Sequence, residues 1–222
     1  MSDTSYNLKI IVLGAGKSER FEGIKLIAAV TEPTDDSRNS TLLIQHVLQQ
    51  IVESLAELNI DKSNLSIATG GYYQQISEVL DPELSIINCS NAHLGLGYSI
   101  AQSVDIVLNN ANNKLESTSH IMITLADQIA LKTDDYVRLI EQSISKPDKL
   151  ICAKAEEQFM PPAIFPRRYF SQLMELNGDK GAKALLQKNR DSLQEVLLAN
   201  AAIDIDTQHD LLIWKKSNLI HL

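Results

Sequence analysis

The sequence predicts an α/β protein built on a mostly parallel sheet. Two observations carry this prediction: short apolar runs of strand length recur along the chain, and amphipathic helical patterns lie between them. Several of the short runs are apolar throughout, as expected for strands that are buried on both faces. Alternation of such strands with helices favours parallel pairing, because a helix is the usual crossover between parallel strands.

Five strands are expected. They lie at Leu8–Leu13, Leu65–Thr69, Leu84–Asn88, Ile121–Leu125 and Leu150–Ala153. After the first of them, apolar residues recur every three or four positions from Leu43 to Leu58. This spacing predicts an amphipathic helix that begins near Leu42 and that Ser40 or Thr41 can cap.

Further helices are expected between the later strands. One begins at Thr133, where Asp134 and Asp135 suit the positive end of the helix dipole. Another follows the apolar spacing from Ile100 to Leu108. The polar segment Glu32–Ser40 is a candidate lid or surface insertion. The 222 residues fit a single domain that spans residues 1–222.

Composition excludes several classes of function. The formal net charge of −8 disfavours binding to nucleic acid or to an anionic membrane surface. The N-terminal segment Met1–Asn7 is polar, and no apolar stretch approaches the roughly 20 residues that span a bilayer. Cys89 and Cys152 lie in apolar runs, which indicates core thiols instead of a disulfide or a metal site. We therefore expect a cytoplasmic protein without nucleic-acid or membrane partners.

A glycine-rich turn follows the first predicted strand. Backbone N–H groups of the turn Gly14-Ala15-Gly16 can converge on a phosphate, and the cations Lys17, Arg20 and Lys25 come soon after it. A P-loop is excluded because Ile11 stands where its first glycine belongs, and a dinucleotide fingerprint because Glu19 replaces its third glycine. The alternative is an ordinary strand-to-helix turn with solvated cations.

Other strand ends supply further polar groups. Ligands of parallel sheets gather at the carboxyl ends of the strands, and these ends carry Thr69-Gly70-Gly71, Asn88–Ser99 and Ala126-Asp127-Gln128. Asp127 can hold Mg²⁺ when a triphosphate completes the coordination shell. The alternative for Asp127 is a helix cap or an ordinary loop carboxylate.

A second acidic motif lies near the C-terminus. Asp204 and Asp206 alternate with Ile203 and Ile205, which predicts a strand with both carboxylates on one face. Two carboxylates on one face repel each other unless a cation or basic group lies nearby. Asp210 is expected to provide the acidic charge that opens the last helix.

These motifs together resemble those of a known family. The pattern Leu-x-Ala-Gly-x-Ser-x-Arg-Phe-x-x-x-Lys-Leu at 13–26 is similar to the signature of MobA-like nucleotidyltransferases, in particular the molybdenum cofactor cytidylyltransferases. Segment 125–128 resembles the family's Leu-Ala-Asp-Gln-Pro motif, with Ile129 in place of proline, and 204–211 resembles Asp-Ile-Asp-Thr-Pro-Glu-Asp-Leu. Segments 161–170 and 178–183 look like acceptor-side segments of the cytidylyl branch.

The resemblance implies a three-layer α/β/α, Rossmann-like nucleotide-diphospho-sugar transferase fold with a mostly parallel, mixed sheet. It implies an Mg²⁺-dependent nucleotidyltransferase that moves CMP from CTP to molybdopterin and releases pyrophosphate. A molybdenum hydroxylase is the implied recipient of the product. Phe21 after Arg20 and the segment Gly178–Gly181 favour the cytidylyl branch, whereas Gly14 stands where that branch usually has alanine.

The resemblance also assigns roles to residues. The catalytic residues would be Arg20, Lys25 and Asp127; the nucleotide-binding residues Leu13, Gly14, Ala15, Gly16, Lys17, Ser18, Lys25, Gly70, Asn91, Gly97 and Ser99; the metal ligands Asp127 and Asp206; and the acceptor-binding residues Pro162, Lys180 and Lys183. His93 is expected to be a surface histidine, because no second ligand lies at metal-binding spacing beside it.

Two alternative functions remain open at this point. One is guanylyl or sugar-phosphate nucleotidyl transfer on the same fold, because one fold can host many functions. The other is a non-catalytic chaperone that binds the molybdenum cofactor. Retention of both Asp127 and Asp206 argues against the chaperone, since a binding module does not need a pair of metal ligands.

Overall fold

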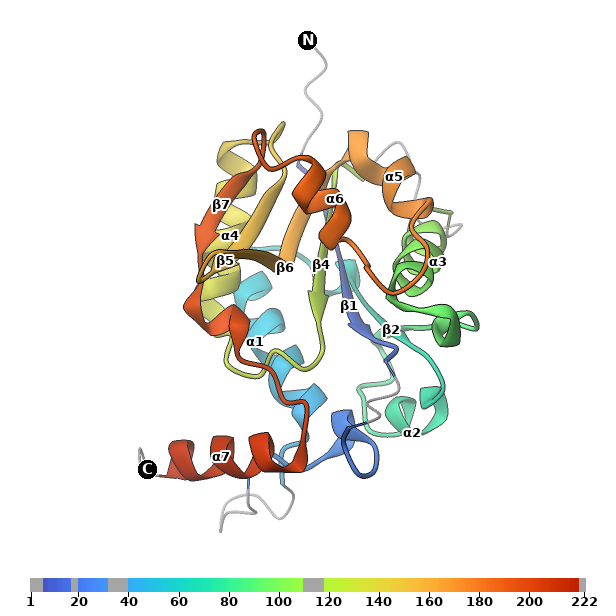
Figure 1. Cartoon of the computed structure of the whole chain (residues 1–222), viewed down its shortest axis with the longest axis vertical. Coiled ribbons are helices and arrows are strands. Elements are labelled where there is room, and N and C mark those ends of the chain that lie inside the picture. Colours follow the sequence, from blue (N-terminus) through green and yellow to red (C-terminus); the bar gives the residue numbers. More distant parts are fainter. Residues whose placement is uncertain (1–5, 17–19, 32–39, 110–117, 220–222) are drawn as a thin grey trace.

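The computed structural model describes residues 6–16, 20–31, 40–109 and 118–219. Within them, seven strands form one sheet in the order β3-β2-β1-β4-β6-β5-β7 (Figure 1). The strands are β1 (Leu8–Gly14), β2 (Leu65–Thr69), β3 (Ser85–Asn88), β4 (His120–Leu125), β5 (Ile151–Ala155), β6 (Gln158–Pro166) and β7 (Gln194–Leu197). The helices are α1 (Leu43–Glu57), α2 (Tyr73–Ser77), α3 (Leu96–Asn109), α4 (Thr133–Ser145), α5 (Phe170–Met174), α6 (Lys183–Lys188) and α7 (Gln208–Leu219).

The sheet is mostly parallel, as predicted. β1 lies between β2 and β4 and is parallel to both, and the pairs β2–β3 and β5–β7 are also parallel. β6 is antiparallel to its neighbours β4 and β5. The five expected strands are present with ends shifted by at most two residues. Every residue of β2 is buried, including Ser66 and Thr69, which explains why its sequence does not alternate between apolar and charged residues.

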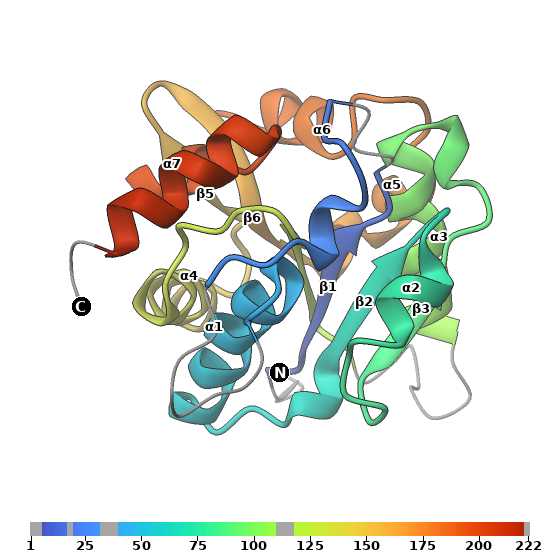
Figure 2. The ribbon, with the colours of Figure 1, turned by 90° about the horizontal axis from the view of Figure 1, so that it is seen from below.

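Helices cover both faces of the sheet and give the predicted three layers. α1 and α4 pack on one face, where Val47 and Ile51 of α1 and Leu139 of α4 join a core with Ile10 of β1. α3, α5 and α6 cover the other face, where Ile100 of α3 belongs to a second core. Figures 1 and 2 show these two helical layers on either side of the strands.

The start of α1 differs from the prediction. Its first turn is capped by Gln45, whose Oε1 accepts a hydrogen bond from the backbone N–H of Leu42 at 3.0 Å. Ser40 and Thr41 do not cap it, because Leu42 is the N-cap residue. Leu42 forms an isolated antiparallel β-bridge with Ala29, and Val30 N–H donates to the carbonyl of Thr41. α4 begins at Thr133 as predicted.

Two smaller expectations can also be compared with the structure. Cys89 and Cys152 are buried free thiols, and burial raises their pKa values to about 11 and about 12. In the described part of the chain, no helix combines the length and the apolar character that crossing a lipid bilayer requires. The segment Glu32–Ser40, expected as a lid or insertion, lies outside the described residues except for Ser40.

Candidate active site

Three carboxylates meet at the carboxyl end of the sheet. Asp127 follows β4, and Asp204 and Asp206 lie on the segment that leads into α7. One oxygen from each of these three side chains lies within 4.8 Å of the other two. We call Asp127, Asp204 and Asp206 the carboxylate cluster. Asp204, which the sequence placed only beside Asp206, is therefore a full member of it.

The segment of Asp204 and Asp206 is not the strand that the alternation predicted. Residues 203–206 have no regular secondary structure, and their backbone contact with the sheet region is one hydrogen bond, from Ile205 N–H to the carbonyl of Asp127 at 3.2 Å. Ile205 is buried, but Ile203 is 48% exposed. The alternation nevertheless directs both carboxylates toward Asp127.

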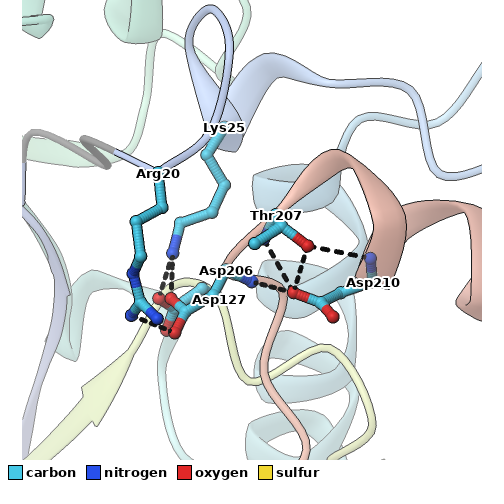
Figure 3. Close-up of polar contacts among 6 residues, drawn as sticks. All are labelled: Arg20, Lys25, Asp127, Asp206, Thr207 and Asp210. Carbon is cyan, nitrogen blue, oxygen red and sulfur yellow. Dashed lines mark hydrogen bonds and ion pairs between the residues drawn. The ribbon is translucent and has the colours of Figure 1, made fainter.

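Two cations from the glycine-rich region contact the carboxylate cluster. Lys25 Nζ lies 2.7 Å from Asp127 Oδ2 and 3.3 Å from Asp206 Oδ1, and Arg20 Nη2 lies 2.5 Å from Asp206 Oδ2 (Figure 3). The Lys25 side chain is only 7% exposed, whereas that of Arg20 is 74% exposed. Because solvent screens an exposed ion pair, Arg20 contributes little stability, and Lys25 is the main counter-charge of the cluster.

The donor set of the carboxylate cluster fits a divalent metal ion. Asp127 Oδ1 is buried and has no hydrogen-bond partner among the described residues. Loss of hydration, and then the charges of Asp127 and Asp206, raise the pKa of Asp204, while Lys25 opposes this shift. An orphaned buried oxygen and crowded carboxylates both gain from a bound cation, and oxygen donors suit Mg²⁺ or Mn²⁺.

Gln128 fixes the loop that carries Asp127. Its side chain is buried, and Nε2 donates to the carbonyls of Pro161 and Ala201, each at 2.8 Å. Its Oε1 accepts from the N–H of Leu125 at 3.4 Å. These bonds join the end of β4 to β6 and to the 3-10 helix Ala199–Ala202. Gln128 belongs to a motif in the sequence but was assigned no role from it. Its position directly after Asp127, a predicted metal ligand, is the signal that could have identified it.

Asp210 organises the segment that carries Asp206. Its Oδ2 accepts from the N–H of Asp206 at 3.1 Å, and from the N–H and the hydroxyl of Thr207 at 2.7 and 2.8 Å (Figure 3). These hydrogen bonds lower the pKa of Asp210. Asp210 thus opens α7, as expected, and in addition holds the backbone of Asp206.

A cavity of about 450 Å³ lies over the carboxylate cluster, and we call it the phosphate cavity. Its lining brings together predicted site residues from distant parts of the sequence: Leu13, Gly14, Gly16, Arg20, Lys25, Asp127 and Asp206. The predicted residues Lys17 and Ser18 lie outside the described residues. The arrangement combines glycine backbone, cations and carboxylates in one pocket, as a metal-bound triphosphate requires.

The phosphate cavity continues along the ends of β1, β2 and β3. A neighbouring cavity of about 260 Å³ shares Gly16 and includes Ala15 and Ser99, and another of about 480 Å³ shares Ala15 and includes Gly70. A Cβ atom at Gly70 would lie 2.7 Å from the carbonyl oxygen of Ala15 and from Ala92 Cβ, so only glycine fits there. We call these three cavities the nucleotide cleft.

Other predicted residues lie around the nucleotide cleft. His93 is exposed, as expected, and lines two of its cavities, and Asn91 is exposed nearby. Gly97 donates its N–H to the carbonyl of Gly178 at 2.7 Å, and a Cβ at Gly97 would meet the backbone of Asn177. Gly97 is therefore needed where two backbone segments pack closely, and its contact with a nucleotide stays a prediction.

The three predicted acceptor residues are not grouped at the carboxylate cluster. Pro162 is buried in β6, and Lys180 and Lys183 are exposed near α6. Lys183 Nζ lies 3.4 Å from Gln158 Oε1. The described lining of the phosphate cavity does not include them. Their role in acceptor binding stays a prediction.

Comparison with known proteins places the chain in a family. A model of the MobA-like NTP transferase domain matches residues 10–195. A search of curated protein sequences finds no significant match.

Solved structures support the fold class. The crystal structure of Rv0371c from Mycobacterium tuberculosis H37Rv is 20% identical, with a TM-score of 0.73 over 96% of this chain and 99% of that chain. Rv0371c complexed with manganese gives 17% identity and a TM-score of 0.68 over 96% and 100%. A nucleotidyl transferase from Methanothermobacter is 13% identical, with a TM-score of 0.73 over 98% and 100%.

A further structure carries a molybdopterin name. Molybdopterin-guanine dinucleotide biosynthesis protein A from Archaeoglobus fulgidus is 13% identical, with a TM-score of 0.60 over 96% of this chain and 99% of that chain. At these identities the likenesses concern the fold, and they confirm the predicted α/β architecture.

Proposed function

This chain belongs to the MobA-like NTP transferase family and is a nucleotidyltransferase, and on that premise we propose that it transfers CMP from CTP to molybdopterin. An oxygen of the acceptor phosphate forms a bond to the α-phosphorus of CTP, the bond from that phosphorus to the bridging oxygen breaks, and pyrophosphate leaves. A molybdenum hydroxylase is the recipient that this proposal implies.

One observation supports the reaction most directly. The carboxylate cluster lies at the open end of a glycine-rich loop, with Lys25 and Arg20 already directed at it. Nucleotidyl transfer depends on positioning and charge neutralisation, so no protein nucleophile is needed. The loop backbone at Gly14 and Gly16 can donate to phosphate oxygens, and both cations can exchange a carboxylate partner for a phosphate.

Asp127, Asp204 and Asp206 would hold a divalent cation, proposed to be Mg²⁺. When bound, Mg²⁺ would neutralise phosphate charge and orient the phosphate oxygens. The similarity in fold to Rv0371c, which has been crystallised with manganese, supports a divalent ion in this family. Gln128 and Asp210 keep the two carboxylate-bearing segments in register through the hydrogen bonds described above.

Guanylyl transfer is the second candidate, because the Archaeoglobus fulgidus structure that this fold resembles is named for a guanine dinucleotide. The cytidylyl proposal depends on the sequence patterns Arg20-Phe21 and Gly178–Gly181. In the structure Phe21 is buried in the core, and it is not in the described lining of the nucleotide cleft.

The test is to incubate the protein with molybdopterin, Mg²⁺ and each of the four nucleoside triphosphates, and to identify products by mass. We expect the CMP adduct from CTP, with a large advantage of CTP over GTP in kcat/KM, since a wrong base leaves buried polar groups unpaired. A clear preference for GTP would overturn the cytidylyl assignment. No turnover with any nucleotide, together with tight binding of the finished dinucleotide, would favour a chaperone.

A further inference from the structure

A second cavity meets the carboxylate cluster from another side. It has a volume of about 510 Å³ and lies between α7, the loop from β4 to α4, and the 3-10 helix Ala199–Ala202. Figure 2 shows α7 alongside that loop. Asp204 lines this cavity, whereas Asp127 and Asp206 line the phosphate cavity. The cluster therefore stands between two cavities, and we call the second one the α7 cavity.

The walls of the α7 cavity are largely apolar. Ile205 and Ala130 are buried at its base, and Trp214 forms part of the wall on α7. Ile203 and Ile213 are 48% and 52% exposed, so they present apolar surface to whatever enters. Apolar and aromatic walls with a few polar groups are typical of sites for small organic ligands.

The α7 cavity is also held in shape, and its lining carries one cation and two carboxylates. Asp135 Oδ2 accepts from Asn200 Nδ2 and from the backbone N–H of Lys132, each at 3.1 Å. Asp135 is only 8% exposed, so one buried carboxylate joins two walls. The side chain of Lys132 lines the exposed part of the cavity. The ammonium group of Lys132 can pair with an anionic group of a ligand, whereas the carboxylates of Asp204 and Asp210 favour hydrogen-bond donors or a bound cation.

We propose that the α7 cavity binds the acceptor, a phosphomonoester whose fused ring system lies between Trp214, Ile203 and Ile213. This inference rests on the proposed function. In an in-line displacement the attacking oxygen approaches opposite the leaving pyrophosphate. The nucleotide cleft takes the triphosphate, so the acceptor approaches from a different side of the cluster. Asp204 marks the α7 cavity as that side.

The inference competes with the prediction that Lys180 and Lys183 bind the acceptor. Gly178 contacts the start of α3 at Gly97, and Asp179 lines a cavity of the nucleotide cleft. The segment directly before Lys180 therefore borders the nucleotide cleft. A test must separate the two locations.

The wild-type protein offers a direct signal, because Trp214 is its single tryptophan. Molybdopterin is the probe, since its pterin ring absorbs where tryptophan emits. In the presence of Mn²⁺ and an unreactive CTP analogue, we expect saturable quenching of Trp214 emission as molybdopterin is added. Free N-acetyltryptophanamide corrects for absorption by the probe. Absence of saturable quenching overturns the inference.

Two neighbouring residues of α7 give a matched pair of variants. Ile213 lines the α7 cavity and is 52% exposed; Leu212 is 54% exposed and outside the described lining. We expect Ile213→Asp to raise the Kd of molybdopterin at least about tenfold, because it replaces an apolar contact with the face of the ring by a charged group, and Leu212→Asp to leave it unchanged. Lys132→Ala should also weaken binding. The Kd of the CTP analogue should stay the same in all three, and circular dichroism checks their folding.

The outcomes distinguish the cavity from the reaction. Equal effects of Ile213→Asp and Leu212→Asp, or weaker binding in Lys180→Ala alone, overturn the α7 cavity as the acceptor site. Transfer of CMP by a protein whose Trp214 is not quenched overturns only the cavity. If molybdopterin binding depends on Ile213 but no nucleotide supports transfer, the α7 cavity is confirmed as the binding site and the proposed reaction is wrong.

Discussion

The two segments that deliver the carboxylates are held in different ways. The loop of Asp127 is anchored in the core: Ala126 and Ile129 are each 1% exposed, and the buried amide of Gln128 bonds to two distant carbonyls. The segment of Asp206 has no regular structure, and Asp210 holds it through local hydrogen bonds. Asp127 is therefore positioned by tertiary packing, whereas Asp206 is held mainly by its neighbours in sequence, with the buried Ile205 and its N–H bond to the carbonyl of Asp127 as the tertiary contact.

This difference has consequences for the chemistry of the site. The side chain of Asp127 is 21% exposed and that of Asp206 is 33% exposed. The less exposed and better anchored carboxylate is the more effective electrostatic group, because water screens it less and it needs less rearrangement. We expect variants of the Asp127 loop to have larger effects than variants of the Asp206 segment.

The largest effect should come from Asp127→Asn. The amide keeps the shape of the side chain but loses the charge that holds a metal against a triphosphate, so kcat/KM should fall about 10²-fold or more. Asp206→Asn should cause a smaller loss, and Asp148→Asn, an exposed residue outside the cluster, none. Turnover of Asp127→Asn within about threefold of wild type would contradict the assignment of the metal ligand.

Lys25→Ala should change two affinities in opposite directions. Lys25 is the buried counter-charge of Asp127 and Asp206, so its removal should let Mn²⁺ alone bind more tightly. The Mn²⁺ complex of CTP should bind more weakly, by about 1.5–3 kcal/mol, because a charge-assisted contact with phosphate is lost. Calorimetric titrations of both ligands measure this. An unchanged affinity for the Mn²⁺ complex of CTP would show that Lys25 does not contact phosphate and has only a structural role.

Gln128→Ala should affect stability and metal binding together. The variant leaves the carbonyls of Pro161 and Ala201 without their partner, which costs about 1–3 kcal/mol in the free energy of unfolding. Urea denaturation and Mn²⁺ titration test this, with the exposed Gln187→Ala as control. If metal affinity stays at the wild-type value while stability falls, Gln128 supports the fold but does not position Asp127.

Asp210→Asn should have the smallest effect. The amide keeps an acceptor for one of the N–H groups of the Asp206 segment, so we expect a loss of stability of about 1 kcal/mol or less. Metal affinity should fall less than in Gln128→Ala. A larger fall would show that the local hydrogen bonds, and not packing, control the geometry of the cluster.

Much of the fold was predictable because buried parallel strands leave a largely apolar signal without alternation, as in β1, β2 and β4. β6 was missed because Pro161 and Pro162 lie inside it, and β7 because it is short and half of it is exposed. Asp127 lies just past a predicted strand, but its role as a metal ligand and the role of Lys25 were assigned only by the resemblance to family motifs. The hydrogen-bond partners of Gln128 were not predictable, since they lie 33 and 73 residues away in the sequence, although its position directly after Asp127 pointed to a role at the site.

The ion pair between Arg20 and Asp206 joins residues that are 186 positions apart. A site assembled over such a separation exists only in the native chain, because no local stretch contains it. Anything that binds there favours the folded state by mass action, by about 2.7 kcal/mol at a free concentration one hundred times its Kd. The melting temperature of the whole domain therefore reports the occupancy of the site. Candidate ligands can be ranked by the thermal shift they cause before any reaction is assayed.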